Sequence, residues 1–415
     1  MNWRKILIVV AFVGVTLGIG FLMYLVFFRP TTPAVNAPIT NEGLTPGGLG
    51  RALEGPPTPV EVSATPTQIL APSLTPPPQL PKEISSVAKG GVTWVGTLVD
   101  KPVANALMAS NGKDVAYYDT TDGKFYRVDE SGNAVKLSDK VFQNVESVTW
   151  APATDKGILE FPDGSNILYD FTSDKQYTLP KHWEGFSFSP DGAQIAGKSI
   201  GVDPNNRWLF VSDPDGTGVK AIEPLGNNAD KVDVNWSPNN QVIATSRTGQ
   251  AMGFERQQIL LVGQNQENFP GLTVEGQGFQ SEWSTTGDRL LYSVHNSASD
   301  YKPVLWLVGA QGDNIGSGRK SLSINTWADK CTFADNDTVY CAVPQTMETG
   351  AGFQPDLFSS VPDSFYKVDL TTGLKSLVAV PYGSFTAESV SITSDGRYLT
   401  FTNSQTGRLE RVQLQ

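Results

Sequence analysis

Histidine is scarce in this chain, which limits the catalytic chemistry open to its side chains. His182 and His295 are the two histidines, and they lie in different parts of the sequence. A serine hydrolase with a nucleophile elbow needs a GxSxG motif and a histidine base, and the sequence contains no GxSxG. We therefore expect no serine triad, and we expect both histidines to be solvent-exposed loop residues.

The acidic stretch DPDGTGVKAIE has a partial likeness to a calcium-binding loop, through Asp213, Asp215 and Glu223. It lacks the third carboxylate that such a loop places before its glycine. It also aligns with the hairpin turns DESGN and DLTTG elsewhere in the chain. We therefore expect a structural turn here. Because the sequence also lacks CxxC, a His-Glu metal motif and a phosphate-binding glycine loop, we expect no metal or cofactor.

Cys331 and Cys341 are the only cysteines, and they flank the hairpin-like stretch CTFADNDTVYC. If Asn336 lies near the tip of that hairpin, the two cysteines face each other across neighbouring strands, where a disulfide can form. Such a bond persists outside the cytoplasm. The sequence predicts a disulfide, and two buried thiols are the alternative.

The elements that carry these residues belong to a repeat. The stretch FSFSPDGAQIAGKS combines an apolar strand, a tight turn rich in Ser, Pro, Asp and Gly, and a second strand. Six related stretches occur at intervals of roughly 40 to 60 residues, in the range of the repeats in β-propellers. The seven central apolar residues of these stretches, which we call anchors, are Met108, Trp150, Phe188, Trp236, Trp283, Phe333 and Ile392.

A second strand–turn–strand element follows each of these stretches, as in NILYDFTSDKQYTL and SFYKVDLTTGLKSL. Four strands per repeat are the unit of a propeller blade. The seventh repeat ends after its third strand, whereas residues 91–100 precede the first repeat without a partner. Pairing the two would remove unpaired strand edges. The sequence therefore predicts an all-β, seven-bladed β-propeller over residues 90–415, closed by an N-terminal strand in the last blade.

The turn motifs FSPDGAQIA, WSPNNQVIA and ITSDGRYLTF resemble the WD40-like repeat of TolB-type periplasmic propellers and of propellers attached to prolyl oligopeptidases. The Trp-Asp and Gly-His signatures of eukaryotic WD40 repeats are absent. The resemblance covers residues 91–415 and implies a propeller, often extracytoplasmic and often a docking platform. No hydrolase domain follows the repeats, so we do not expect peptidase activity.

The N-terminal part of the chain has a different composition. Residues 6–28 carry no charge and are long enough for a membrane-spanning helix, which needs about 20 residues. Basic residues precede this span, so residues 1–5 are predicted to be cytoplasmic and the remainder extracytoplasmic. A cleaved signal peptide is the alternative. Residues 29–89 contain 13 of the 28 prolines and predict a disordered, Pro-rich linker.

The net charge of −11 argues against nucleic acid and against an anionic membrane surface as partners, because both require clustered Lys and Arg. The blade pattern predicts short A–B and C–D turns, where strands A to D run outward from the axis. It predicts long B–C loops in four consecutive blades, the longest over residues 344–364. Long loops on a rigid scaffold usually carry recognition.

Several large apolar side chains lie on these loops. If they are exposed, they suit a protein partner; in the alternative, the longest loop folds back and buries them. The candidate partner-binding residues are Met347, Phe353, Leu357, Phe358, Phe254 and Tyr301. We expect a membrane-anchored extracytoplasmic propeller that binds a protein in an envelope or cell-surface assembly. A polysaccharide- or cell-wall-binding propeller is the alternative, and an enzyme with a central-channel site is a third. We do not expect a small-molecule substrate.

Overall fold

The structure is a computed structural model that describes residues 17–18 and 83–415. The predicted membrane span over residues 6–28 and most of the predicted linker over residues 29–89 lie outside the described residues. In the described part of the chain, no helix is both long and apolar enough to cross a membrane. All strands and 3-10 helices of the described residues lie within residues 83–415.

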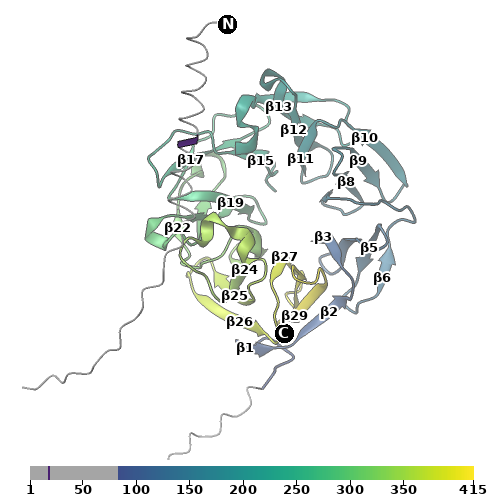
Figure 1. Cartoon of the computed structure of the whole chain (residues 1–415), viewed down its shortest axis with the longest axis vertical. Helices are drawn as coiled ribbons and strands as arrows, with labels where there is room; N and C mark the ends of the chain where they lie inside the picture. The colour runs from purple at the N-terminus through teal and green to yellow at the C-terminus, as the bar shows by residue number, and fades with distance from the viewer. Residues whose placement is uncertain (1–16, 19–82) are drawn as a thin grey trace, which may run out of the picture. The chain divides into compact units, whose positions relative to one another are not determined.

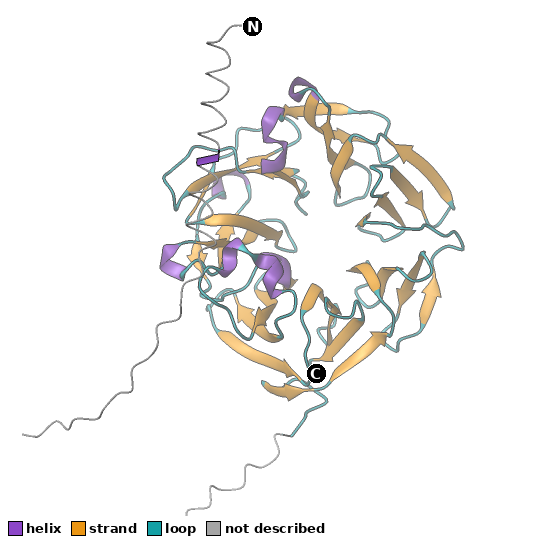
Figure 2. Ribbon diagram, in the orientation of Figure 1, coloured by secondary structure: helices purple, strands orange, loops and turns teal. Residues whose placement is uncertain are grey.

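Seven β-sheets stand around a central opening, so the predicted seven-bladed β-propeller is confirmed (Figures 1 and 2). Each sheet contains four antiparallel strands, ordered from the innermost strand A to the outermost strand D, and the sheet of blade 6 has a fifth strand outside these four. These strands form because their sequences are rich in β-branched and aromatic residues, which favour extended backbone. Gly- and Asp-rich turns separate one strand from the next. Short 3-10 helices lie in some of the connections.

The first four blades follow one another along the chain. Their strands, from A to D, are β3 (Val103–Met108), β4 (Val115–Asp119), β5 (Lys124–Val128) and β6 (Ala134–Lys136) in blade 1; β7 (Ser147–Trp150), β8 (Lys156–Glu160), β9 (Asn166–Asp170) and β10 (Lys175–Leu179) in blade 2; β11 (Trp183–Phe188), β12 (Ile195–Ile200), β13 (Arg207–Ser212) and β14 (Lys220–Pro224) in blade 3; and β15 (Val232–Val234), β16 (Ala244–Ser246), β17 (Gln257–Val262) and β18 (Leu272–Val274) in blade 4.

The last three blades complete the ring. Their strands, from A to D, are β19 (Gln277–Trp283), β20 (Arg289–His295), β21 (Val304–Gly309) and β22 (Lys320–Ser321) in blade 5; β23 (Cys331–Asp335), β24 (Thr338–Pro344), β25 (Asp363–Asp369) and β26 (Lys375–Pro381) in blade 6; and β27 (Ala387–Ile392), β28 (Tyr398–Asn403), β29 (Leu409–Gln413) and β2 (Val95–Val99) in blade 7. The 3-10 helices are η1 (Pro204–Asn206), η2 (Gly226–Lys231), η3 (Ser297–Ser299), η4 (Gly312–Asn314), η5 (Ala328–Lys330), η6 (Ala351–Phe353) and η7 (Pro355–Phe358).

The N-terminal strand closes the ring, but the predicted strand over residues 91–100 is divided between two blades. β2 is the outermost strand of blade 7, where Val95 lies opposite Val412 in an antiparallel pair with β29. β1 (Gly91–Thr93) instead pairs in parallel with β26 and adds a fifth strand to blade 6. The prediction of one strand was therefore wrong in this detail. The entering chain lies across the outer edges of both blades at the seam (Figure 1).

The repeated turn motif explains why the A and B strands form hairpins. In blade 3, Ser189 Oγ donates to the Asp191 carboxylate at 2.6 Å and accepts the backbone N–H of Gln194 at 2.9 Å. Gly192 has φ +67°, a conformation that favours glycine. Blade 7 uses Thr393 and Asp395 in the same way. The Ser/Thr-x-Asp-Gly pattern thus satisfies the polar groups of the turn locally.

The hydrophobic core lies between neighbouring sheets. One cluster joins blade 6 to blade 7 through Phe365 and Phe401, which are fully buried, and it includes Val95 of the closing strand. Anchors Trp150, Phe188, Trp236 and Trp283 are also buried. Closure therefore buries apolar surface in addition to pairing strands. Full burial of one large apolar side chain stabilises a fold by about 1.5–3 kcal/mol.

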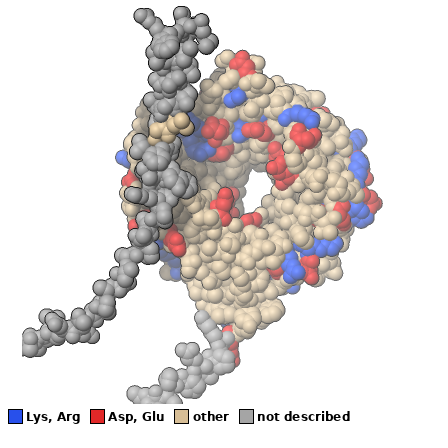
Figure 3. Space-filling model, viewed as in Figure 1, with Lys and Arg blue, Asp and Glu red and all other residues tan. Residues whose placement is uncertain are grey.

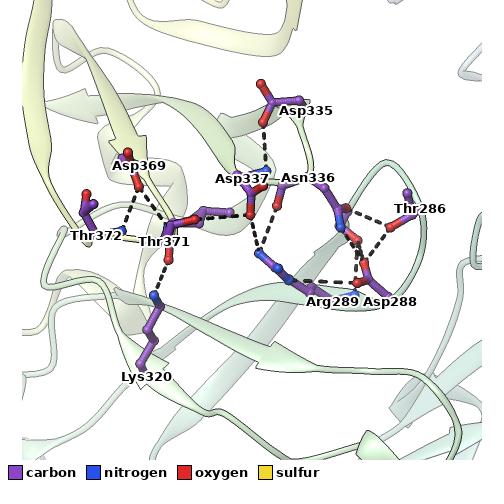
Figure 4. A network of polar contacts seen from close by, with 12 residues as sticks. Thr286, Asp288, Arg289, Lys320, Asp335, Asn336, Asp337, Asp369, Thr371 and Thr372 are labelled. Carbon is purple, nitrogen blue, oxygen red and sulfur yellow. Dashed lines mark hydrogen bonds and ion pairs between the residues drawn. The ribbon is translucent and has the colours of Figure 1, made fainter.

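The predicted disulfide between Cys331 and Cys341 is confirmed. The two residues lie directly opposite each other on strands A and B of blade 6, with a Cα–Cα distance of 4.1 Å. The tip of the same hairpin docks on blade 5 (Figure 4). There Arg289 donates to Asp337 at 3.0 Å, and Asn336 donates to Asp288 at 2.9 Å. The disulfide hairpin therefore connects two blades.

The B–C loops of blades 3 to 6 are the long ones, as predicted. They are residues 201–206, 247–256, 296–303 and 345–362. The prediction that all C–D turns are short was wrong for blades 4 and 5, where residues 263–271 and 310–319 form longer connections. Because strands alternate in direction, the B–C loops and the starts of the A strands lie on one face, which we call the long-loop face.

Candidate functional site

Three of the predicted partner-binding residues are exposed on the long-loop face. The exposed fractions are 69% for Phe254, 52% for Phe353 and 66% for Leu357. Met252 and Val202, on the B–C loops of blades 4 and 3, are 43% and 99% exposed. Exposed apolar side chains thus occur on the B–C loops of blades 3, 4 and 6. We call this set of five residues the apolar surface.

The other three predicted residues are partly buried. Tyr301 packs on Phe353 with ring centroids 5.1 Å apart, and Phe358 packs on Trp327 at 5.5 Å. Met347 lines a cavity of about 390 Å³ between blades 5 and 6. The longest loop therefore folds back in part: Phe358 turns toward the protein while Leu357, its neighbour, faces solvent.

Hydrogen bonds between the loops hold this surface in place. Glu255 accepts from the backbone N–H of Ser297 at 2.9 Å and from its hydroxyl at 2.8 Å, which joins the loops of blades 4 and 5. These bonds also lower the pKa of Glu255. The backbone N–H of Gly352 donates to the carbonyl of Tyr301 at 2.8 Å, which joins blade 5 to blade 6. The loops therefore form one belt.

The belt continues onto blade 7. The Ser404 hydroxyl donates to the carbonyl of Ser359 at 2.6 Å, and the Thr386 hydroxyl donates to the carbonyl of Val361 at 2.8 Å. Loops joined in this way cannot easily withdraw their apolar side chains from solvent. The exposed surface is therefore a preformed feature of the fold.

The expectation that both histidines are solvent-exposed was wrong for His295. His182 is exposed in the turn between blades 2 and 3, whereas His295 is only 5% exposed at the end of β20. Gly278 and Gly352 approach so closely that a Cβ at either position would collide with the imidazole. Burial lowers the pKa of His295, and its Nε2 has no hydrogen-bond partner among the described residues.

A ring of carboxylates surrounds the channel on the long-loop face, and the sequence analysis did not identify it. Each member lies at the start of an A strand or within two residues before it, and each is exposed to solvent. Figure 3 shows acidic side chains around the central opening. The members of this acidic ring are Glu146, Glu184, Asp233, Asp329 and Glu388, from blades 2, 3, 4, 6 and 7.

Few cations balance this ring. Lys198 is 3.3 Å from Glu184, and Arg247 is 3.7 Å from Asp233. Lys330 is instead directed to Asp363, a buried carboxylate of β25, at 2.7 Å. Within residues 83–415, no ion pair involves Glu146, Asp329 or Glu388.

The environment of the ring raises the pKa of two of its carboxyl groups. Displacement of water by the surrounding protein raises the pKa of Asp329, and the charge of Lys330 opposes this rise. Displacement of water also raises the pKa of Glu388; the charge of Lys330 opposes that rise, and the charge of Asp329 adds to it. These carboxylates are therefore held in a site that disfavours their negative charge.

Below the ring, the channel contains a cavity of about 470 Å³ lined by inner strands of blades 1, 5, 6 and 7. Glu282 and Asp329 line it together with Cys331 and Phe333. Burial, with a contribution from the charge of Asp329, raises the pKa of Glu282 to about 7. A carboxyl group that titrates near neutral pH is chemically able to donate and accept a proton.

The structure also places the other acidic residues that the sequence singled out. Asp213 and Asp215 hold the turn after β13, where Thr217 donates to Asp215 at 2.7 Å, and Glu223 lies in β14. Asp213 and Asp215 therefore form the predicted turn, whereas Glu223 is part of a strand. In the described part of the chain, no group of three or more His, Cys, Asp or Glu residues is arranged to hold a metal ion.

Comparisons with known proteins show the fold alone. No family model and no curated protein sequence matches this chain. Among solved structures, oligogalacturonate lyase in complex with manganese is 12% identical, with a TM-score of 0.54 over 77% of this chain and 93% of that one. The β-propeller domain of Swd1 from Myceliophteria thermophila is 13% identical, with a TM-score of 0.52 over 77% and 100%. The oligogalacturonate lyase of Vibrio parahaemolyticus is 10% identical, with a TM-score of 0.53 over 77% and 91%.

Proposed function

We propose that this chain is a membrane-anchored, extracytoplasmic β-propeller that binds a protein partner through its long-loop face. The partner would belong to an envelope or cell-surface assembly. The apolar surface carries this proposal: Phe254, Phe353 and Leu357 are more than half exposed on loops that hydrogen bonds hold together. Exposed, preorganised aromatic and aliphatic side chains are typical of protein interfaces.

The placement outside the cytoplasm has two supports. Residues 6–28 are apolar and uncharged, with basic residues on their N-terminal side. The disulfide between Cys331 and Cys341 suits an oxidising compartment. The TolB-type resemblance of the repeats agrees with this placement.

Blade 6 provides a matched pair of positions to test the proposal. Leu357 on the long-loop face is 66% exposed, and Leu374 on the opposite face of the same blade is 65% exposed. A photo-crosslinking amino acid is placed at either position in the full-length protein in its own cells. We expect a discrete crosslinked protein from position 357 and none from position 374. Equal crosslinking from both positions, or none, contradicts the proposal.

The lyase activity of two structural neighbours does not fit this channel well. Oligogalacturonate is a polyanion, and the acidic ring at the channel mouth would repel it. A neutral polysaccharide remains the alternative ligand for the long-loop face, because Phe254 and Phe353 present exposed rings. Crosslinking of a protein from position 357, without binding of isolated cell-wall glycan, supports the protein partner over the polysaccharide.

A second candidate function is supported by Glu282. With its pKa raised to about 7 in a cavity of about 470 Å³, this carboxyl group has the properties of a general acid or base acting on a small molecule. A screen of chromogenic ester, amide and glycoside substrates tests it. If the protein turns over a substrate and Glu282→Gln abolishes this activity, the result supports an enzyme. If the activity survives the substitution, it comes from another group or from a contaminant.

A further inference from the structure

The long-loop face combines two features with different chemistry. The apolar surface lies on the B–C loops, between the second and third strands of blades 3, 4 and 6. The acidic ring lies further in, at the start of the A strands. Since both are at the same end of the strands, a ligand that covers the loops and reaches inward meets apolar side chains first and carboxylates next.

The charge of the loops extends that of the ring. Loop 345–362 contains Glu348 and Asp356 but no Lys or Arg. The arginines of loop 247–256 are engaged: Arg247 pairs with Asp233, and Arg256 lies 3.0 Å from Glu275. The surface that a partner would contact is therefore apolar in its outer part and negative toward the channel.

The ring has carboxylates that are able to pair with a cation. Within residues 83–415, Asp329 and Glu388 are exposed and take part in no ion pair. The charge of Lys330 opposes the rise in the pKa of both, but its ammonium group is directed to Asp363 at 2.7 Å. An incoming cation would pair with Asp329 and Glu388 without breaking that ion pair.

We propose that the long-loop face binds a cationic, amphipathic segment of the protein partner. Its apolar side chains contact Phe254, Phe353 and Leu357, and its Lys or Arg side chains enter the acidic ring beside Asp329 and Glu388. This inference rests on the proposed function and adds the chemistry of the partner. The complementary charges increase the association rate and select the partner, while the apolar contacts provide most of the affinity.

The test begins with the protein crosslinked from position 357 and with the full-length propeller protein. Mass spectrometry identifies the crosslinked segment, which is then synthesised as a peptide. We expect this segment to have a net positive charge and interspersed large apolar residues. An acidic segment, or one without apolar residues, overturns the inference while leaving the proposed function intact. Absence of any protein crosslinked from position 357 removes both.

Charge substitutions then test the ring directly. We expect Asp329→Asn combined with Glu388→Gln to weaken binding of the synthesised peptide by about tenfold at low salt, and by much less in about 0.5 M salt. Asp313→Asn, on the opposite face, is the control and is expected to bind as the parent does. The thermal midpoint of each variant is measured to verify folding. Binding that is insensitive to both the ring substitutions and salt overturns the inference.

Discussion

The imidazole of His295 meets the ring of Phe353 edge to face, with centroids 4.6 Å apart and planes at 70°. This contact joins strand B of blade 5 to the long loop of blade 6. Phe353 presents its other side to Tyr301 and to solvent. A residue of the apolar surface is thus positioned by a buried histidine.

We predict that acid loosens the loop around Phe353 because of His295. Burial lowers its pKa in the folded protein, so the unfolded chain binds more protons below the ordinary value of about 6.5. The free energy of unfolding should therefore decrease as pH falls through that region. Urea titrations at several pH values check this. The free energy of unfolding should change less steeply with pH in His295→Gln, and as steeply as in the parent in His182→Gln. An unchanged pH dependence in His295→Gln contradicts the prediction.

We predict that the disulfide contributes about 2.5 kcal/mol to the free energy of unfolding, from the loop entropy of a sequence separation of 10. Urea unfolding with and without a reducing agent measures this value. The double variant Cys331→Ala and Cys341→Ala serves as the control, because its stability should not respond to the reducing agent. A loss below about 1 kcal/mol on reduction would mean that the docked hairpin tip already restrains the loop.

Glu282 should give the opposite pH dependence from His295. Its pKa is raised from 4.5 to about 7, so the folded protein holds an extra proton between these values. The stabilisation is present below about pH 4.5 and is lost as pH rises through 7. The loss amounts to about 3 kcal/mol at most, and Glu282→Gln should remove it. Infrared difference spectra should show its protonated carboxyl band disappear near pH 7; disappearance near pH 4.5 would refute the raised pKa.

Stepwise N-terminal truncation should separate the two strands at the seam. Removing residues 1–94 deletes β1 and should cost less stability than removing residues 1–100, which also deletes β2 and Val95 from the core. The longer truncation exposes the edge of β29, so we expect it to self-associate. Thermal unfolding and light scattering check the order. Equal losses for the two truncations would mean that β1 carries the closure.

The sequence predicts the blades well because each turn satisfies its own polar groups. The Ser189–Asp191–Gly192 turn is a local structure, and seven copies of one local pattern define the ring. The separate pairing of β1 with blade 6 was missed because β1 is a three-residue parallel strand, held by β26 and not by any pattern of its own. The burial of His295 was missed because it depends on Gly278 and Gly352. Both are separated from His295 in the sequence, and neither belongs to a motif that would place it beside the imidazole.

The acidic ring was missed because its members come from five blades and form no motif within any one of them. A signal was nevertheless present in the repeat. Glu146, Glu184, Asp329 and Glu388 each lie four residues before an anchor, and Asp233 lies three before Trp236. The ring becomes visible when the repeats are aligned on their anchors and the residue three or four positions before each anchor is compared.

The division of the entering chain between β1 and β2 has a mechanical consequence. A pull applied at residue 83 first meets Ala88, whose backbone N–H donates to the Gln413 carbonyl of blade 7 at 2.8 Å, and then Gly91–Thr93 on the outer edge of blade 6. Both contacts precede Val95–Val99 along the chain, so they would break before the β2–β29 pair that closes the ring is strained.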